Sequence, residues 1–419
     1  MRRKTIMGKL GLAVIADDLT GAMDCCGYFG RLGFATTVHL DAPFSSASEV
    51  LAVTTNSRAE TPAVARARVI EAVRRLSPRP IFKKIDSTLR GNIGVELAAV
   101  LDELGTDKTI VAPAFPEMGR TTVRGVMRVY GVAVSETHFG ADPVFPVKES
   151  SVLSLLRQST GRRVASVSIE QIEAGPGSLQ ARIAEGRQDI WVCDATQTAH
   201  LTTIARAAAL AEGRWLLCGS TGLARETHVL LGEPARKRER PDPGPSAGRA
   251  LALVGSLNPV SAGQLLRAEE RLALIGLDSH PDGLAARNTS SSGFGKTLEE
   301  ARRLLAQGRS LAISSTFSPR HPEMKAGVPS FLAGIAESLA KGHNVSGLFL
   351  SGGDVAWAVC RRLGLSPISI LGEVEPGVPA GVAGWDEGGS LRIITKAGGF
   401  GSREVIVKAL PFLERGELS

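Results

Sequence analysis

The sequence lacks the features that place a chain in several common functional classes. Its five cysteines form no C-x-x-C pair and its seven histidines show no H-x-x-x-H or H-E-x-x-H spacing, so neither a thiol redox centre nor a zinc site is predicted. Aromatic residues make up 5% of the chain and the basic residues are dispersed, which argues against nucleic-acid binding despite a net charge of +7. No run reaches the about 18 apolar residues of a membrane-spanning helix, and no signal peptide is visible. We therefore expect a cytoplasmic protein with reduced thiols.

The hydrophobic pattern predicts α/β architecture with mainly parallel sheets. Short apolar runs alternate with amphipathic helical segments in the first quarter of the chain, and such alternation is typical of parallel strands joined by helices. We expect strands at 12–16, 35–40, 50–54, 81–85, 109–112, 190–194 and 215–218, and helices at 21–31, 64–76 and 94–104. Residues 121–189 give no clear pattern.

A domain boundary is predicted at residues 233–248, where four prolines and a charge cluster exclude a core element. The chain is thereby divided into an N-terminal domain, 1–232, and a C-terminal domain, 249–419. The second domain begins another strand and helix series, with strands expected at 250–254, 311–315, 347–350 and 391–395.

Two consecutive aspartates, Asp17 and Asp18, follow the first strand and precede a helix. This position places polar groups at the carboxyl edge of a parallel sheet, where α/β proteins bind ligands. One alternative is that one aspartate caps the helix and the other is merely solvated. A phosphatase loop of the D-x-D type is not favoured, because consecutive side chains of a strand point apart.

A second group of polar residues follows the strands at 50–54 and 81–85. Arg58 offers a planar fork suited to a carboxylate, although a surface arginine is the simpler interpretation. The segment 82–94 places two lysines, an aspartate, two hydroxyls and an arginine before a helix, which few purely structural loops require.

Small-residue turns follow two strands of the second domain, at Ser256 and at Gly352-Gly353-Asp354. Their backbone amides are suited to phosphate oxygens, although each turn alone is also compatible with an ordinary connection. The stretch 290–297 nearly fits a P-loop, but Ser290 replaces the first glycine and Thr297 begins a capping box. We interpret it as a helix start.

On these segments the sequence resembles the four-carbon acid sugar kinase family, over nearly the whole chain. The resemblance rests on 16–22, 83–94, 140–147 and 219–224, and on 255–259, 350–354, 375–379 and 396–401 in the second domain. It implies that the first domain binds a sugar acid through Asp18, Arg58, Lys84, Asp86, Ser87, Thr88 and Arg90. It implies that the second domain binds ATP through Ser256, Gly352, Gly353, Asp354 and Gly399. Many members have a threonine where this chain has Val355, which leaves one nucleotide contact open.

The family implies transfer of the γ-phosphoryl group of Mg²⁺-bound ATP to the terminal (C4) hydroxyl of a four-carbon sugar acid. Asp18 or Asp86 would accept the hydroxyl proton, with Asp18 preferred, and Arg58 or Arg90 would bind the substrate carboxylate. D-threonate or D-erythronate is the expected substrate, with 3-oxo-tetronate as the alternative. A non-catalytic sugar-acid and nucleotide sensor and a phosphate-ester hydrolase are the competing classes. We expect no nucleic-acid or membrane partner, and homodimers are an ordinary possibility.

Overall fold

The computed structural model describes residues 11–41, 47–142, 145–234, 247–277, 292–316, 327–340, 342, 344–384 and 389–418. The chain divides into two compact units, residues 1–25 with 43–235, and residues 26–42 with 236–419. This division differs from the predicted domains at 26–42, which group with the C-terminal unit. Most of the predicted linker, 235–246, lies outside the described residues.

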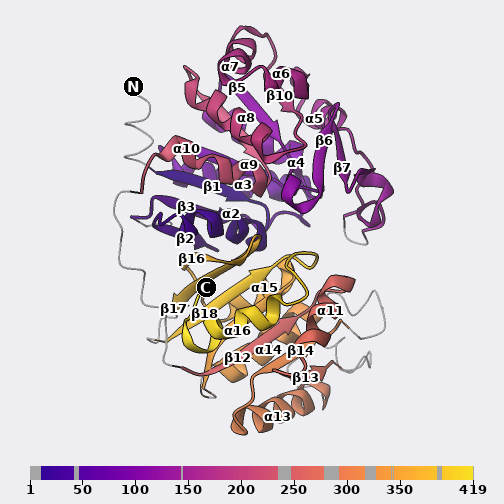
Figure 1. Ribbon diagram of the computed structural model, residues 1–419, viewed down its shortest axis with the longest axis vertical. Helices are drawn as coiled ribbons and strands as arrows, with labels where there is room; N and C mark the ends of the chain where they lie inside the picture. Colours follow the sequence, from indigo (N-terminus) through magenta and orange to yellow (C-terminus); the bar gives the residue numbers. More distant parts are fainter. Residues whose placement is uncertain are drawn as a thin grey trace. The chain divides into compact units, whose positions relative to one another are not determined.

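The first unit is built on a parallel sheet (Figure 1). Its strand order is β3 (Val50–Thr54), β1 (Leu12–Ala16), β4 (Ile81–Lys84), β11 (Trp215–Gly219), β5 (Lys108–Ala112), β10 (Ile190–Cys193) and β9 (Val164–Val167). β1 and β3 are buried along their whole length, as expected for parallel strands covered on both faces. The predicted strands are confirmed, whereas β9 lies in the segment that gave no clear pattern.

Two groups of helices accompany this sheet. α3 (Pro62–Leu76), α4 (Ile93–Leu104) and α5 (Val152–Thr160) pack in series and contribute to one hydrophobic core with the strands. α6 (Ile169–Glu173), α7 (Pro176–Glu185), α9 (Thr221–Glu226) and α10 (His228–Leu231) pack against α8 (Thr198–Leu210). α2 (Leu19–Arg31) begins directly after the β1 loop.

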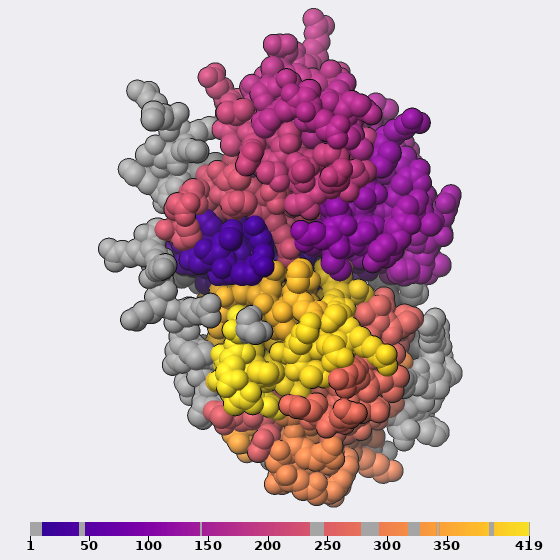
Figure 2. Space-filling view, viewed as in Figure 1, coloured from indigo at the N-terminus to yellow at the C-terminus, as the bar shows by residue number. Residues whose placement is uncertain are grey.

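A small antiparallel sheet follows β5 and was not predicted. It consists of β6 (Arg120–Val123), β7 (Val126–Val129) and β8 (Val132–Ala133), and it lies at the surface of the first unit, purple in Figure 2. The β6–β7 turn is tied to the main sheet, because the N–H groups of Arg124 and Gly125 donate to the Asp194 carboxylate at 2.6 and 2.8 Å.

The second unit has a mixed sheet. Parallel strands β13 (Ala273–Gly276), β14 (Leu311–Ser314), β12 (Arg249–Val254), β15 (Val345–Ser351) and β18 (Ser390–Lys396) are followed by antiparallel β17 (Val378–Gly384), β16 (Ile368–Glu375) and β2 (Thr36–His39). The pairing of β2 with β16 accounts for the grouping of 26–42 with this unit. Its helices are α11 (Pro259–Ala268), α13 (Ser292–Ala306), α14 (Val328–Ala340), α15 (Gly353–Arg362) and α16 (Val405–Arg415).

One feature of the second unit differs from the sequence prediction. Thr297 lies inside α13, which begins at Ser292, so the interpretation of Thr297 as a cap is wrong. The segment 375–379, which supports the family resemblance, spans the end of β16, a turn and the start of β17. Of the helices that the structure describes, none combines the length and the apolar character needed to cross a membrane.

Candidate functional site

The polar loops of the first unit follow neighbouring strands. β3, β1, β4 and β11 are adjacent and parallel, so the residues that follow them meet at one edge of the sheet. Asp17 follows β1, Arg58 lies on the loop after β3, and Asp86 lies on the loop after β4. The topology therefore gathers the predicted substrate residues at the position where open α/β sheets bind ligands.

Arg58 holds the carboxylates of both consecutive aspartates. Its Nε and Nη2 atoms donate to the two Asp17 oxygens at 2.7 and 2.9 Å. Its Nη1 and Nη2 atoms donate to the two Asp18 oxygens at 2.9 and 2.8 Å. A guanidinium has five N–H donors, so most of the Arg58 donors are committed to these two carboxylates.

Asp18 also begins the helix. Its oxygens accept from Thr20 Oγ1 at 2.6 Å and from the N–H of Gly21 at 3.0 Å, so Asp18 caps α2, as the simpler alternative anticipated. The expectation that the two aspartates point apart is wrong. Asp18 belongs to the cap of the helix, and the alternation of a strand does not extend to it.

Asp17 is a buried member of this group that was not among the predicted site residues. Its side chain is only 4% exposed. Burial disfavours its charged form, but the Arg58 charge and hydrogen bonds outweigh burial, so the pKa of Asp17 lies below its usual value. Asp17 is therefore not the solvated aspartate that the alternative interpretation of the pair required.

The loop after β4 has its own ion pair. Arg90 Nε donates to Asp86 Oδ2 at 2.7 Å, and Thr88 Oγ1 donates to the same oxygen at 2.5 Å. Burial opposes ionisation of Asp86, but Arg90 and Arg58 hold its pKa well below the usual value. Leu89 adopts a left-handed conformation with φ of 62°, a strained geometry for a branched residue that is often found at functional sites.

The two lysines of β4 have different environments. Lys83 is fully buried and its Nζ lies 2.8 Å from Glu96 Oε2 on α4. Lys84 donates to the carbonyl of Ile85 at 2.9 Å. A Cβ atom at Gly21 would lie 2.5 Å from Asp18 Oδ1 and 3.1 Å from Lys84 Nζ, so a glycine is required where Lys84 approaches Asp18. Lys84 therefore lies beside Asp18, whereas Lys83 pairs with Glu96.

Arg120 is a further cation that the sequence prediction missed. It lies at the start of β6, and its Nη1 atom donates to Ser87 Oγ at 3.1 Å. Burial lowers the pKa of Arg120, and the Asp86 carboxylate is the largest opposing influence. Arg120 directly precedes the segment without a clear pattern, and no sequence signal linked it to the loop at 86–90.

Asp24 is a second residue that sequence reasoning missed. It lies on α2, is 7% exposed, and accepts from Thr221 Oγ1 at 2.6 Å. Its Oδ1 atom has no hydrogen-bond partner among the residues that the structure describes. Burial raises the pKa of Asp24, although Arg225 and Thr221 oppose the shift. Thr221 lies in the segment 219–224 that supports the family resemblance, but no pattern pointed from it to Asp24.

The glycine turns of the second unit also converge. A Cβ atom at Gly398 would lie 2.2 Å from Ser256 Oγ, and one at Gly352 would lie 3.8 Å from the Ser256 backbone nitrogen. A Cβ atom at Gly399 would lie 3.3 Å from Asn258 Nδ2. The predicted Ser256, Gly352 and Gly399 are therefore close neighbours within this unit.

The remaining predicted nucleotide residues begin α15. Gly352 precedes this helix with φ of 107°, Gly353 is its first residue, and Asp354 is exposed in its first turn. Val355 is 2% exposed, and its Cγ2 atom would lie 2.5 Å from a Cβ atom at Gly255. The side chain of Val355, at the position where many family members have a threonine, therefore packs into the interior of this unit.

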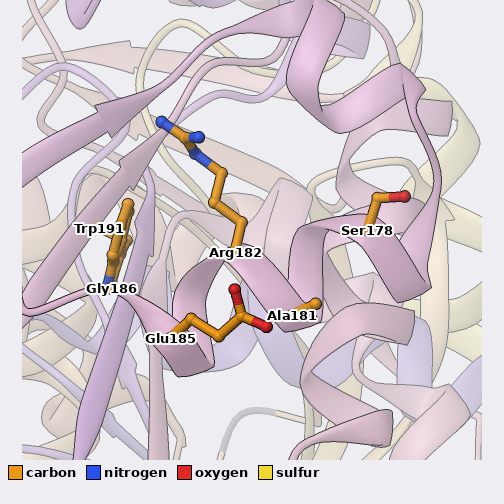
Figure 3. Close-up of a pocket in the computed structure, with 6 residues that line it drawn as sticks. All are labelled: Ser178, Ala181, Arg182, Glu185, Gly186 and Trp191. Carbon is orange, nitrogen blue, oxygen red and sulfur yellow. The ribbon is translucent and has the colours of Figure 1, made fainter.

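A shallow hollow elsewhere on the first unit carries none of the predicted site residues. Its Arg182 guanidinium lies 5.9 Å from the centre of the Trp191 ring. Figure 3 shows its lining residues, which are Ser178, Ala181, Arg182, Glu185, Gly186 and Trp191.

Within the described parts of the chain, no group of three or more His, Cys, Asp or Glu side chains is arranged to hold a metal ion.

Comparison with known proteins gives matches in both units. The family model of a sugar-binding N-terminal domain matches residues 12–227, and that of a nucleotide-binding C-terminal domain matches residues 251–406. A D-threonate kinase of Salmonella typhimurium is 32% identical, with 96% of this chain and 98% of the relative covered. A D-erythronate kinase of Heliobacterium modesticaldum is 31% identical (96% and 97% covered), and a 3-oxo-tetronate kinase of Pseudomonas savastanoi pv. phaseolicola is 30% identical (95% and 96% covered).

A solved structure supports the fold. The crystal structure of a protein described as a putative tRNA synthase from Salmonella typhimurium LT2 has a TM-score of 0.81 and 24% identity, and the match covers 96% of this chain and 98% of that chain. This likeness extends to the architecture alone. The two family models and the near full-length relatives show that the chain belongs to the four-carbon acid sugar kinase family.

Proposed function

We propose that this protein transfers the γ-phosphoryl group of ATP to the terminal (C4) hydroxyl of a four-carbon sugar acid, with D-threonate as the first candidate. The observation that carries the proposal is the convergence of Asp18, Arg58, Asp86 and Arg90 at the carboxyl edge of the sheet. This convergence lies inside the segment that matches a sugar-binding domain. Alternating carboxylates and guanidinium groups supply acceptors for sugar hydroxyls and donors for a carboxylate.

The hydrogen bonds of Arg58, Arg90 and Arg120 indicate different roles for the three arginines. Arg58 serves chiefly to hold Asp17 and Asp18, because most of its donors already bond to them. Arg90 and Arg120 flank Asp86 and Ser87 from two different elements. We place the substrate carboxylate nearer to Arg90 and Arg120, and the reacting hydroxyl nearer to Asp18.

ATP is proposed to bind through the turns at Ser256, Gly352–Asp354 and Gly399, inside the segment that matches a nucleotide-binding domain. Backbone amides of glycine turns approach phosphate oxygens closely. Mg²⁺ would enter as part of the Mg-ATP substrate and bridge phosphate oxygens, a recurring arrangement in phosphoryl transfer.

D-threonate is preferred because the loop from Lys84 to Asn92 resembles that of the threonate and erythronate kinases. The relatives include both kinds of kinase at similar identity, 32% for the D-threonate kinase of Salmonella typhimurium and 30% for the 3-oxo-tetronate kinase of Pseudomonas savastanoi. D-erythronate and 3-oxo-tetronate are the alternative acceptors.

The proposal is tested by ADP release from Mg-ATP with D-threonate, L-threonate, D-erythronate and 3-oxo-tetronate as acceptors. We expect rapid turnover with D-threonate and slow turnover with the others. Rapid turnover with another acid would reassign the substrate. Phosphate release that needs no acceptor would indicate a hydrolase, and a melting temperature raised by ATP and an acid without ADP release would indicate a sensor.

Replacing Arg58 with lysine is expected to lower kcat/KM for the acid by about tenfold or more. A lysine ammonium supplies a point charge and cannot hold two carboxylates through the donors that Arg58 uses. The matched control is Arg66→Lys on α3, where both partners of the Arg66–Asp102 pair are about half exposed. Equal kinetics in the two variants would contradict the holding role of Arg58.

A further inference from the structure

The turn after β18, residues 397–402, has its carbonyl groups held from one side. Lys396 Nζ donates to the carbonyl oxygens of Ala397 at 3.2 Å and Gly398 at 2.9 Å, and Ser261 Oγ also donates to Gly398 at 2.9 Å. Gln264 Nε2, on α11, lies 3.0 Å from each of three further carbonyl oxygens, those of Phe400, Gly401 and Ser402. Donors from two elements therefore fix the orientation of several successive peptide groups.

The opposite side of the same peptide groups presents amides. In a trans peptide the N–H points away from the C=O of the same plane. The held carbonyls of 397, 398 and 400 thus direct the N–H groups of Gly398, Gly399 and Gly401 to the other side. Among the residues with described structure, none of these N–H groups donates a hydrogen bond. Gly401 has φ of 81°, and successive amides in such turns form concave sites for anions.

Lys396 lies beneath these amides without a charged partner in the described part of the chain. Its side chain is buried, with 1% exposure, and its hydrogen-bond acceptors are Ser261 Oγ, at 3.2 Å, and the two turn carbonyls. The groups that its ammonium contacts, Ser261 Oγ and the carbonyls of Ala397 and Gly398, are uncharged. Further along the turn, the Glu375 carboxylate accepts from the N–H of Ser402 at 2.6 Å and pairs with Lys408. Burial lowers the pKa of Lys396 to about 7. An ammonium in this position favours a bound anion nearby.

We infer that Lys396 and Gln264 are positioning residues that direct the amides of Gly398, Gly399 and Gly401 at the phosphates of a nucleoside diphosphate or triphosphate, and that nucleotide binding is coupled to protonation of Lys396. This inference rests on the proposed function of the second unit. The phosphates supply the negative charge that the described surroundings of Lys396 lack. Above neutral pH, nucleotide binding then takes up a proton from solvent at Lys396 Nζ.

Calorimetry of Mg-ADP binding to the full chain tests the coupling. Between about pH 7 and about pH 9 we expect the wild-type dissociation constant to rise, and the binding heat to depend on the ionisation enthalpy of the buffer because a proton is taken up. Lys396→Arg keeps its charge over this range, so its affinity should not follow pH in this way. Lys396→Met should bind about tenfold or more weakly at the lower pH and show no proton uptake.

Gln264 provides an independent test of the turn geometry. Gln264→Glu replaces the amide donors by oxygens facing three carbonyls, so Mg-ADP should bind more weakly than to Gln264→Leu, which only removes the donors. If Gln264→Glu and Gln264→Leu both bind Mg-ADP as tightly as the wild-type chain, the positioning role is overturned.

Wild-type affinity that does not change with pH, or the same change in Lys396→Met, would overturn the coupling and leave the proposed kinase standing. Failure of the wild-type chain to bind Mg-ADP at any pH would overturn the nucleotide site as well.

Discussion

Asp18→Asn is expected to lower kcat by about a hundred- to ten-thousandfold, the usual contribution of a general base. The Asp18 carboxylate is the more accessible of the two that Arg58 holds, with 13% of its side chain exposed against 4% for Asp17. Asparagine cannot accept the proton of the attacking hydroxyl, whereas it keeps the size of the side chain. Steady-state kinetics with saturating Mg-ATP and the best acceptor of the panel measure the loss.

Asp17→Asn is the matched control for this prediction. Both variants remove one carboxylate from Arg58, so both disturb the same group of hydrogen bonds. A much larger loss of kcat in Asp18→Asn separates proton acceptance from the holding of Arg58. Equal losses would contradict the assignment of the base to Asp18, and the next candidate would be Asp86, the alternative base on the loop after β4.

The sequence predicted the parts of the fold that depend on local periodicity. β1 and β3 appear as continuous apolar runs because parallel strands are buried on both faces, and their ends are confirmed at Ala16 and Thr54. The small sheet β6–β8 consists of short strands with partly exposed faces, so its alternation is too brief to identify. The pairing of β2 with β16 joins segments far apart in the sequence, which no local pattern encodes.

The candidate site was predictable where polar residues follow strands, and not where long-range packing supplies a residue. Arg58 and Asp86 were identified from their loops, but Asp17 was not among the predicted site residues. Arg120 meets Ser87 from the small sheet, whose β6–β7 turn is itself tied to Asp194, and no local pattern encodes either contact. The roles of the predicted residues remain predictions, since geometry gives proximity and not turnover.

Lys396 illustrates the same limit in the second unit. The sequence indicated a glycine turn at 396–401, and the resemblance attached it to nucleotide binding. The burial of Lys396 depends on α11, which lies more than a hundred residues earlier in the chain and contributes Ser261 and Gln264. A lysine at the end of a strand is ordinarily exposed, so only the tertiary structure identifies its unusual environment.

Removing one partner of the buried Lys83–Glu96 pair is expected to give the largest loss of stability. The two side chains are 0% and 1% exposed, and breaking such a pair costs about 3 to 5 kcal/mol because one charge stays buried without compensation. Glu96→Gln should therefore lower the free energy of unfolding of the full chain by about this amount in a urea titration followed by circular dichroism. Glu96 Oε1 also accepts from Ser57 Oγ at 2.6 Å, a bond that glutamine can retain.

The double variant Lys83→Met with Glu96→Leu separates the charge effect from packing. Replacing a buried pair by apolar residues of similar volume is often nearly neutral, so the double variant should be more stable than Glu96→Gln. A double variant as unstable as the single one would assign the loss to packing or to the Ser57 hydrogen bond instead.

The buried side chains of Lys83 and Lys396 predict opposite dependences of stability on pH. Burial lowers the pKa of Lys83, but the Glu96 carboxylate outweighs burial, so the pKa of Lys83 is raised in the folded state. The stability that the charged Lys83 contributes is therefore present below the unfolded pKa and is lost only as pH rises through the higher folded pKa. For Lys396 burial prevails, its pKa falls to about 7, and stability should increase as pH rises from about 7 towards the unfolded lysine value. In the absence of nucleotide, Lys396→Met should therefore reduce the rise in stability over this interval, whereas the Lys83–Glu96 double variant should leave that rise in place.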